Sequence, residues 1–224
     1  MKNKTALIAG ATGLIGNELL QILREGTYYQ KIYVLTRREL NLSGARVAQL
    51  LLNYDTFTSA DLPEVDDVYC CLGTTMKNAG SKEAFRKVDY EFPLKIAKLS
   101  RTNGAKQYIL VSSMGADKNS SIFYNQVKGE TENALLAVAY PALHIFRPSI
   151  LLGDRKENRT GEKVAQQVMK GVAPLLKGKL KNYRPVEGQA VAKAMFVAAQ
   201  QNLQGPHLFE SEQIKVLAKE YQTE

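Results

Sequence analysis

Three regularly spaced glycines directly after a short apolar run constrain this chain more than any other feature. Gly10, Gly13 and Gly16 follow the apolar residues 6–9, which have the pattern of a buried strand, and a helix-like stripe of leucine and isoleucine comes next. In this order Gly10 permits a sharp turn, Gly13 lets the backbone approach a pyrophosphate, and Gly16 lets the helix pack tightly. The amides of the first helical turn then face the phosphates. The predicted phosphate site consists of Gly10, Ala11, Thr12, Gly13, Leu14, Ile15 and Gly16.

Strand-like and helical patterns alternate along the chain. Strands are expected at residues 5–9, 31–36, 46–53, 65–72, 107–113 and 143–151, and helices at residues 14–24, 82–101 and 121–138. This alternation implies an α/β fold in which parallel strands are joined by right-handed crossovers, with helices on both faces of the sheet. No linker or repeat divides the chain, so we expect one domain over residues 1–224. Within it, residues 149–224 are expected to form a small C-terminal extension that supplies substrate-side elements over the cleft.

Charge and cysteine content narrow the partners and the compartment. Thirty basic and 22 acidic residues give a formal net charge of +8, but the basic residues are dispersed, so nucleic-acid binding is disfavoured. The neighbours Cys70 and Cys71 exclude a disulfide framework, and we expect them to be core residues of a cytoplasmic protein. His144 and His207 have no partners at metal-ligand spacing, so no metal site is expected. No apolar run is long enough to span a membrane.

The end of the second predicted strand bears on the choice of cofactor. A site selective for NAD(H) commonly places Asp or Glu there to bind the ribose 2′-hydroxyl. This strand instead ends in Thr36-Arg37-Arg38, with no acid before Glu39. Guanidinium groups can hold a 2′-phosphate through charge-assisted hydrogen bonds, whereas a carboxylate would repel it. We therefore predict NADP(H) over NAD(H), with Arg37 as first candidate and Arg38 as second; the alternative is a pair of solvated surface arginines.

A tyrosine and a lysine four residues apart, Tyr124 and Lys128, follow the strand that ends in Ser112-Ser113. On a helix the two side chains share a face. An unperturbed tyrosine has a pKa of about 10, and a neighbouring ammonium favours the phenolate and lowers that pKa. We predict Tyr124 as general acid/base, Lys128 as its cation and ribose ligand, and Ser113, ahead of Ser112, as the group that holds a substrate carbonyl. A chance pair on a helix surface is the alternative, which the order of the motifs disfavours.

Longer strings connect these motifs, above all Cys-Cys-Leu-Gly-Thr-Thr at residues 70–75 and Gln-Val-Lys-Gly-Glu at residues 126–130. On them the chain resembles the atypical short-chain dehydrogenase/reductase superfamily, and more narrowly the Tat-interacting-protein oxidoreductase family and its bacterial relatives. The resemblance spans nearly the whole chain. It implies a single Rossmann-type, doubly wound parallel sheet that binds NADP(H). It also implies further cofactor-binding residues: Leu72, Gly73, Thr74, Arg147, Pro148 and Ser149. Of these, Gly73 and Thr74 would lie near the ribose, and Pro148 and Ser149 near the carboxamide.

The leading hypothesis is an NADP(H)-dependent oxidoreductase that transfers a hydride between nicotinamide and a small carbonyl or alcohol substrate. The alternative is a non-catalytic NADP(H)-sensing regulatory or protein-interaction module. The resembled family includes regulators, and Val88-Asp89 stands where superfamily members often have asparagine. A sugar-nucleotide epimerase or dehydratase ranks lower, since 224 residues leave little for a substrate lobe. In the polar loop at residues 153–159, Arg155 or Arg159 is a candidate for an anionic substrate, although a surface ion-pair network is favoured.

Overall fold

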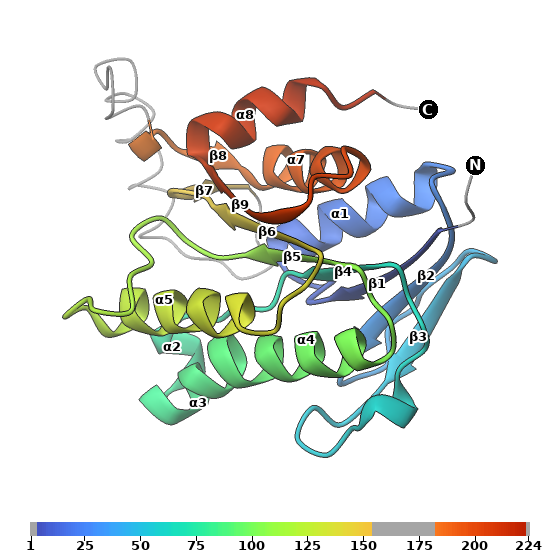
Figure 1. Ribbon diagram of the computed structural model, residues 1–224, viewed down its shortest axis with the longest axis horizontal. Helices are drawn as coiled ribbons and strands as arrows, with labels where there is room; N and C mark the ends of the chain where they lie inside the picture. Colours follow the sequence, from blue (N-terminus) through green and yellow to red (C-terminus); the bar gives the residue numbers. More distant parts are fainter. Residues whose placement is uncertain (1–3, 154–181, 223–224) are drawn as a thin grey trace.

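The computed structural model describes residues 4–153 and 182–222 of the chain. Within them a seven-stranded sheet has the order β3-β2-β1-β4-β5-β6-β9, and every neighbouring pair is parallel (Figure 1). The strands are β1 (Lys4–Ala9), β2 (Tyr29–Thr36), β3 (Val47–Leu51), β4 (Asp67–Cys70), β5 (Gln107–Val111), β6 (Ala142–Arg147) and β9 (Gly205–Glu210). A separate pair, β7 (Leu151–Leu152) and β8 (Val186–Glu187), is also parallel.

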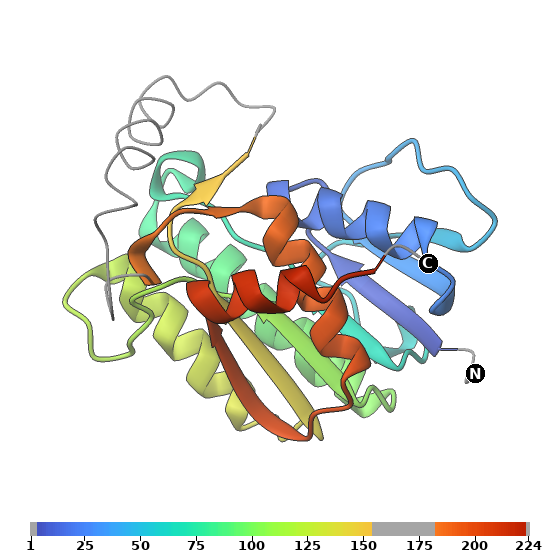
Figure 2. The same cartoon turned by 90° about the horizontal axis from the view of Figure 1, so that it is seen from above.

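Helices cover both faces of the sheet. Figure 1 shows α1, α7 and α8 on one side and α4 and α5 on the other, and Figure 2 gives the view from above. The helical segments are α1 (Leu14–Glu25), α2 (Met76–Ala79), α3 (Lys82–Arg86), α4 (Phe92–Thr102), α5 (Phe123–Leu136), α7 (Gly188–Gln200) and α8 (Ser211–Lys219), with a 3₁₀ turn η1 (Ser59–Asp61) and a π-helical turn η2 (Lys87–Glu91). The Rossmann-type doubly wound sheet expected from the sequence is therefore confirmed.

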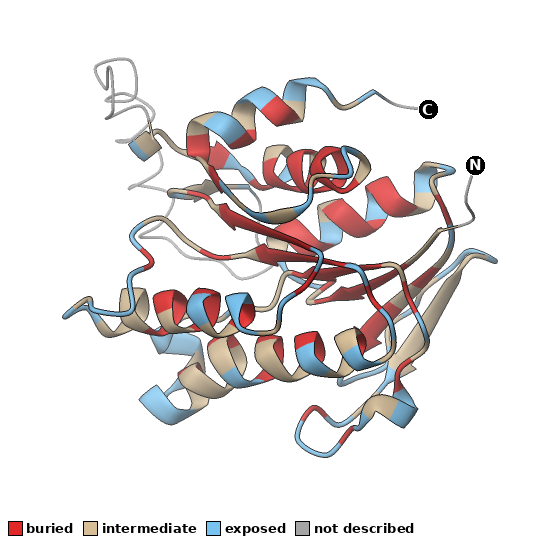
Figure 3. Ribbon diagram, in the orientation of Figure 1, coloured by how far each residue is buried: buried red, intermediate tan, exposed pale blue. Residues whose placement is uncertain are grey.

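Two hydrophobic clusters form the core, one on each face of the sheet. Ile8 and Phe146 face α1, α7 and α8, whereas Leu7 and Leu110 face α4 and α5. Because both faces are covered, the central strands are continuous apolar runs rather than alternating ones. Figure 3 shows these strands as almost wholly buried. The resulting rigid sheet fixes where each strand delivers the residue that follows it.

The sheet order has its switch point between β1 and β4. The chain builds outward from β1 through β2 to β3, and then returns to add β4 on the other side of β1. In doubly wound folds ligands bind outside the carboxyl ends of the strands at such a switch point. The glycine turn follows β1, and residues 71–74 follow β4. Both segments therefore lie at the position that the fold favours for a ligand.

The single long helix expected at residues 82–101 is wrong, because α3 and α4 are separated by the π-helical turn η2. Pro93 explains the break, since proline cannot donate a backbone hydrogen bond to the carbonyl four residues earlier. That carbonyl belongs to Asp89, and the hydroxyl of Thr131 in α5 donates to it instead at 2.8 Å. The π turn thus ties α5 to the segment that carries Asp89.

One further expectation needs correction. The sixth strand ends at Arg147 rather than at residue 151, because Pro148 follows it and the chain restarts as β7. Within the final third, β9 joins the sheet beside β6 and α7 packs on α1. In residues 4–153 and 182–222, no helix is long and apolar enough to cross a bilayer.

Candidate cofactor and catalytic site

The glycine turn has the geometry that a phosphate site requires. Gly10 has φ +83°, and a Cβ there would lie 2.6 Å from the carbonyl carbon of Cys71, the residue that follows β4 in the sequence. A Cβ on Gly16 would lie 2.1 Å from the Gly10 carbonyl oxygen, so α1 packs directly on the turn. Thr12 and Gly13 are exposed, and no side chain caps the N-terminus of α1. The first helical turn carries no acid, so its positive dipole end is not compensated.

The two arginines after β2 are exposed, and they directly follow the buried Thr36 at the carboxyl end of the strand. The Arg37 guanidinium carbon lies 5.8 Å from the ring centre of Tyr54, whose hydroxyl donates to the Leu35 carbonyl at 2.9 Å. Burial raises the pKa of Tyr54, which keeps this phenol neutral beside the cation. The stacking orients Arg37 along the strand end. Arg38 lies next to it and is also exposed.

Residues after β4 approach the lysine of the predicted pair. The amide of Thr74 donates to Asp89 Oδ2 at 2.8 Å, and Asp89 Oδ1 lies 2.7 Å from Lys128 Nζ. A Cβ added to Gly73 would lie 3.6 Å from that same Nζ. Gly73 and Thr74, predicted as cofactor residues, are therefore brought together with Lys128. Leu72 precedes them and is half-buried.

Tyr124 and Lys128 occupy the first half of α5 and share a face of it. Tyr124 is half-buried and packs on the buried ring of Phe85, with ring centres 5.6 Å apart. Burial alone would lower the pKa of Lys128, but the Asp89 carboxylate and the Tyr124 phenol outweigh it, so the pKa is raised. Lys128 is thus a buried cation throughout the neutral range.

The two serines after β5 differ in their contacts. Ser112 is buried and its hydroxyl donates to the Glu132 carboxylate, which also accepts from Arg147 Nε at 3.0 Å. The Ser113 hydroxyl is shielded from solvent and has no hydrogen-bond partner among the described residues. Ser112 is therefore committed to a structural network, whereas Ser113 retains a hydroxyl for a ligand.

The residues that follow β6 are held by the fold. Arg147 pairs with Glu132, which accounts for a raised pKa of its guanidinium. The Pro148 carbonyl accepts from the Met114 amide at 2.9 Å, and this bond ties the loop after β6 to the loop after β5. The Ser149 hydroxyl donates to the Arg184 carbonyl at 2.6 Å. These three predicted cofactor residues lie at the carboxyl edge, and the Arg147 and Ser149 side chains already bind protein atoms.

Gly129 has a packing role next to Lys128 on α5. A Cβ there would lie 2.2 Å from the backbone nitrogen of Lys118 and 2.3 Å from the carbonyl carbon of Asp117. The loop between β5 and α5 therefore lies directly on the helix at this point. Only glycine permits that contact next to Lys128.

The C-terminal extension reaches the glycine turn. A Cβ added to Gly153 or Gly188 would lie 2.7 Å from side-chain carbons of Leu14, the first residue of α1. The strands β7 and β8 thus sit close to the N-terminus of α1. Arg155 and Arg159 lie outside the described residues.

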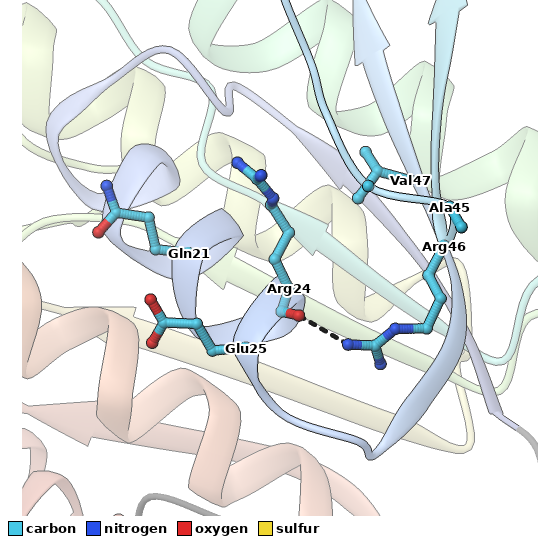
Figure 4. A pocket seen from close by; sticks show the side chains of 7 residues that line it. Gln21, Arg24, Glu25, Ala45, Arg46 and Val47 are labelled. Atoms are coloured by element: carbon cyan, nitrogen blue, oxygen red, sulfur yellow. Dashed lines mark hydrogen bonds between the residues drawn. The ribbon is translucent and has the colours of Figure 1, made fainter.

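A surface pocket of about 400 Å³ is found at the other end of α1, away from the glycine turn (Figure 4). Arg46 donates there to the carbonyls of Arg24, Gly26 and Tyr29 at 2.6, 2.7 and 2.9 Å, and so caps the C-terminal end of the helix. The Arg24 guanidinium donates to Ser43. Both cations therefore hold the loop to the helix, and none of the predicted site residues lines this pocket. Its lining consists of Gln21, Arg24, Glu25, Gly44, Ala45, Arg46 and Val47.

Three residues of the site region were not predicted from the sequence. Asp89 contacts Lys128, Thr131 holds the backbone of Asp89, and Glu132 binds Ser112. The available signal was the placement of polar residues on the buried face of α5, where Thr131 and Glu132 follow Lys128. Among the described residues no cluster of His, Cys, Asp and Glu could hold a metal ion.

The parallel sheet, its strand order and the glycine turn after β1 define a protein of the Rossmann-type α/β class. The HIM1 family model matches residues 39–180, and rat protein HTATIP2 is 38% identical over 172 residues, which cover 75% of this chain and 71% of that protein. The chain belongs to this HIM1/HTATIP2-like family, and the resemblance expected from the sequence is confirmed. FMP52 of Debaryomyces hansenii is 32% identical over 213 residues, 90% of each chain.

The solved structure of MoeE5 in complex with UDP-glucose and NAD supports the fold assignment. It has a TM-score of 0.70 at 12% identity and covers 96% of this chain and 81% of its own. At this identity the similarity establishes the architecture alone.

The expectation of a purely cytoplasmic location is wrong. Family members including FMP52 of Debaryomyces hansenii and Candida albicans are named as mitochondrial proteins. The inference depended on Cys70 and Cys71, which are free thiols, one buried and one half-buried, as predicted. Unpaired thiols exclude a disulfide framework but do not distinguish one reducing compartment from another.

Proposed function

We propose that this chain binds NADP(H) and is an oxidoreductase that interconverts a carbonyl and an alcohol, with Tyr124 as general acid/base. The observation that carries the proposal is the buried Lys128 on the same helical face as Tyr124, next to the residues that follow β4. A helix face with a phenol and a charged ammonium is the arrangement that proton transfer to a carbonyl oxygen requires.

The chain fits a dinucleotide at several points. Gly13 is exposed and lacks a side chain where phosphates would approach, and the uncapped N-terminus of α1 favours negative charge. Arg37 and Arg38 offer guanidinium groups to a 2′-phosphate at the end of β2. The shielded Ser113 hydroxyl has no partner among the described residues, as expected of a group that binds a ligand.

Each residue has a defined part in the proposed reaction. The chemistry that a nicotinamide would supply, held by the glycine turn and Lys128, is the transfer of a hydride to or from the substrate carbon. Ser113 donates a hydrogen bond to the carbonyl oxygen and holds it beside the phenol. Tyr124 gives its proton to that oxygen, and Lys128 stabilises the phenolate that remains. In the reverse direction the Tyr124 phenolate accepts the alcohol proton.

One observation favours the second candidate, an NADP(H)-binding regulator without turnover. Asp89 already neutralises Lys128, which reduces the net positive charge that the Tyr124 phenol experiences. A site of this kind can bind a cofactor and still be a weak acid/base catalyst.

Tyr124→Phe separates the two functions. We expect the purified protein to oxidise NADPH with some member of a panel of aldehydes, ketones and quinones, and the variant to lose at least about 100-fold in rate. NADPH affinity, measured by calorimetry, should change little. Binding without oxidation across the panel would favour the regulator, and an equally active variant would remove Tyr124 from the mechanism. No heat of binding with either cofactor would remove both candidates.

A further inference from the structure

We propose that Asp89 is a positioning residue that fixes the charge and place of Lys128 and thereby sets the pH at which Tyr124 loses its proton. The inference rests on the proposed function, because it assigns Asp89 a task in that site. It adds a residue that no motif at the glycine turn or the Tyr-x-x-x-Lys pair contains.

The contacts of Asp89 are directed entirely to the site. Its side chain is 0% exposed and that of Lys128 is 7% exposed, so their 2.7 Å contact is a buried ion pair. The second carboxylate oxygen accepts the Thr74 amide at 2.8 Å. The Asp89 carbonyl accepts the Thr131 hydroxyl, also at 2.8 Å. Asp89 is thus held by α5 and by the loop after β4, and its carboxylate fixes the Lys128 ammonium next to that loop.

The charges of Asp89 and Lys128 both affect the pH at which the Tyr124 phenol loses its proton. Removal of a charge about 4–6 Å from an ionisable group commonly moves the pKa of that group by about 1–3 pH units. Tyr124 and Lys128 interact, so the two groups lose their protons in two coupled steps that cannot be assigned to either residue alone. Removal of the negative charge of Asp89 makes the first of these two proton losses easier. With Asp89 in place, Lys128 stays protonated and the phenol releases its proton at a higher pH than beside an unpaired ammonium.

Other groups around the pair do not replace this charge. The Cys70 thiol of β4 faces Lys128, but burial raises its pKa and it stays neutral. Arg86 of α3 and Glu130 of α5 form their own ion pair nearer the surface. Among the groups that face Lys128 in the described residues, Asp89 is the carboxylate.

The test is a pH titration of the tyrosine phenolate absorbance, from which the same titration with Tyr124→Phe is subtracted. Asp89→Asn keeps the shape of the side chain and an oxygen for the Thr74 amide, but removes the charge. We expect the Tyr124 phenolate to appear at least about one pH unit lower in Asp89→Asn than in the parent protein. An unchanged midpoint, or a higher one, overturns the proposal.

Asp67→Asn is the matched control. Asp67 is a second buried carboxylate, 3.2 Å from Lys4 Nζ, at the amino end of β4 and so at the opposite edge of the sheet. Its loss should destabilise the fold without moving the Tyr124 midpoint. An equal shift in both variants would show that the effect is structural and would overturn the proposal.

Asp89→Glu keeps the charge and provides the second variant. We expect its Tyr124 midpoint to stay close to that of the parent; a midpoint as low as that expected for Asp89→Asn contradicts the proposal. The titration needs no substrate and no turnover. A protein that never oxidises NADPH but shows the expected shift disproves the proposed reaction and leaves the role of Asp89 standing.

Discussion

A Cβ added to Gly16 would lie 2.1 Å from the carbonyl oxygen of Gly10, so the first turn of α1 and the glycine turn are in direct backbone contact. A Cβ on Gly13, by contrast, would be 3.4 Å from that oxygen, which is an ordinary contact, and Gly13 has a φ of −78° that alanine readily adopts. The two glycines therefore have separable roles, one in the fold and one at the surface that a phosphate would meet.

Gly13→Ala is expected to weaken NADPH binding by at least about tenfold, because the new methyl group occupies the phosphate approach. Its urea midpoint should stay near that of the parent. Gly16→Ala should lower the urea midpoint, since the turn must move. Calorimetry and urea unfolding measure the two effects. A Gly13→Ala protein that binds NADPH normally would place the phosphates elsewhere.

Arg37→Ala is expected to reduce the affinity for NADPH by about 10-fold to 100-fold while the affinity for NADH changes little, because one charge-assisted contact to the 2′-phosphate is lost. Arg38→Ala should have a smaller effect in the same direction. Arg101→Ala, on α4, is the control for a general loss of positive charge. Cofactor titration with both nucleotides provides the measurement. An unchanged ratio of the two affinities would remove the assignment.

The Asp89–Lys128 pair should also be visible in stability. Lys128→Met leaves a buried carboxylate without its counter-ion and is expected to cost about 3–5 kcal/mol in the free energy of unfolding. Addition of Asp89→Asn to that variant should restore a large part of the loss, because no unpaired buried charge remains. Urea unfolding of the two single variants and the double variant gives the coupling energy. Strictly additive losses would mean that the two side chains do not form the ion pair.

His144 should make the fold sensitive to acid. It is fully buried in β6 opposite His207 in β9, and burial, with a smaller contribution from His207, lowers its pKa to about 4 from about 6.5. The folded state therefore favours the neutral imidazole. Its contribution to stability is complete above pH 6.5 and is lost as the pH falls from 6.5 towards 4, by up to about 3 kcal/mol.

His144→Leu tests this directly. Urea unfolding between pH 8 and pH 4 should show a steep loss of stability in the parent protein and a shallower one in the variant. His207→Gln, at the exposed edge of the sheet, should keep most of the acid sensitivity. An identical slope for the parent and His144→Leu would show that other groups account for it.

The motifs near the start of the chain could be interpreted well because their chemistry is local. Gly10, Gly13 and Gly16 act through backbone geometry within one turn, and Arg37 follows directly from where β2 ends. The alternation of strands and helices determines a parallel sheet, since crossovers of one hand leave few arrangements. These predictions needed no knowledge of contacts between distant residues.

The rest of the site depended on such contacts. Asp89 reaches Lys128, 39 positions later, from the π turn η2, and the presence of Pro93 does not by itself specify that turn. The different contacts of Ser112 and Ser113 depend on Glu132 of α5, which the strand sequence does not contain. Strand β9 begins Gly205-Pro206, which disfavours a strand by local propensity, and its pairing with β6 overrides that preference.

The position of α7 against α1 has a consequence for synthesis of the chain. The apolar stripe of α1 (Leu14–Glu25) leaves the ribosome well before the helix that packs against it, which spans Gly188–Gln200. One side of this stripe packs on the neighbouring strands β1 and β2, but the side that faces α7 has no native partner until α7 is made. Transiently exposed apolar surface is prone to aggregation, so this side of α1 is open to non-native contacts until α7 emerges.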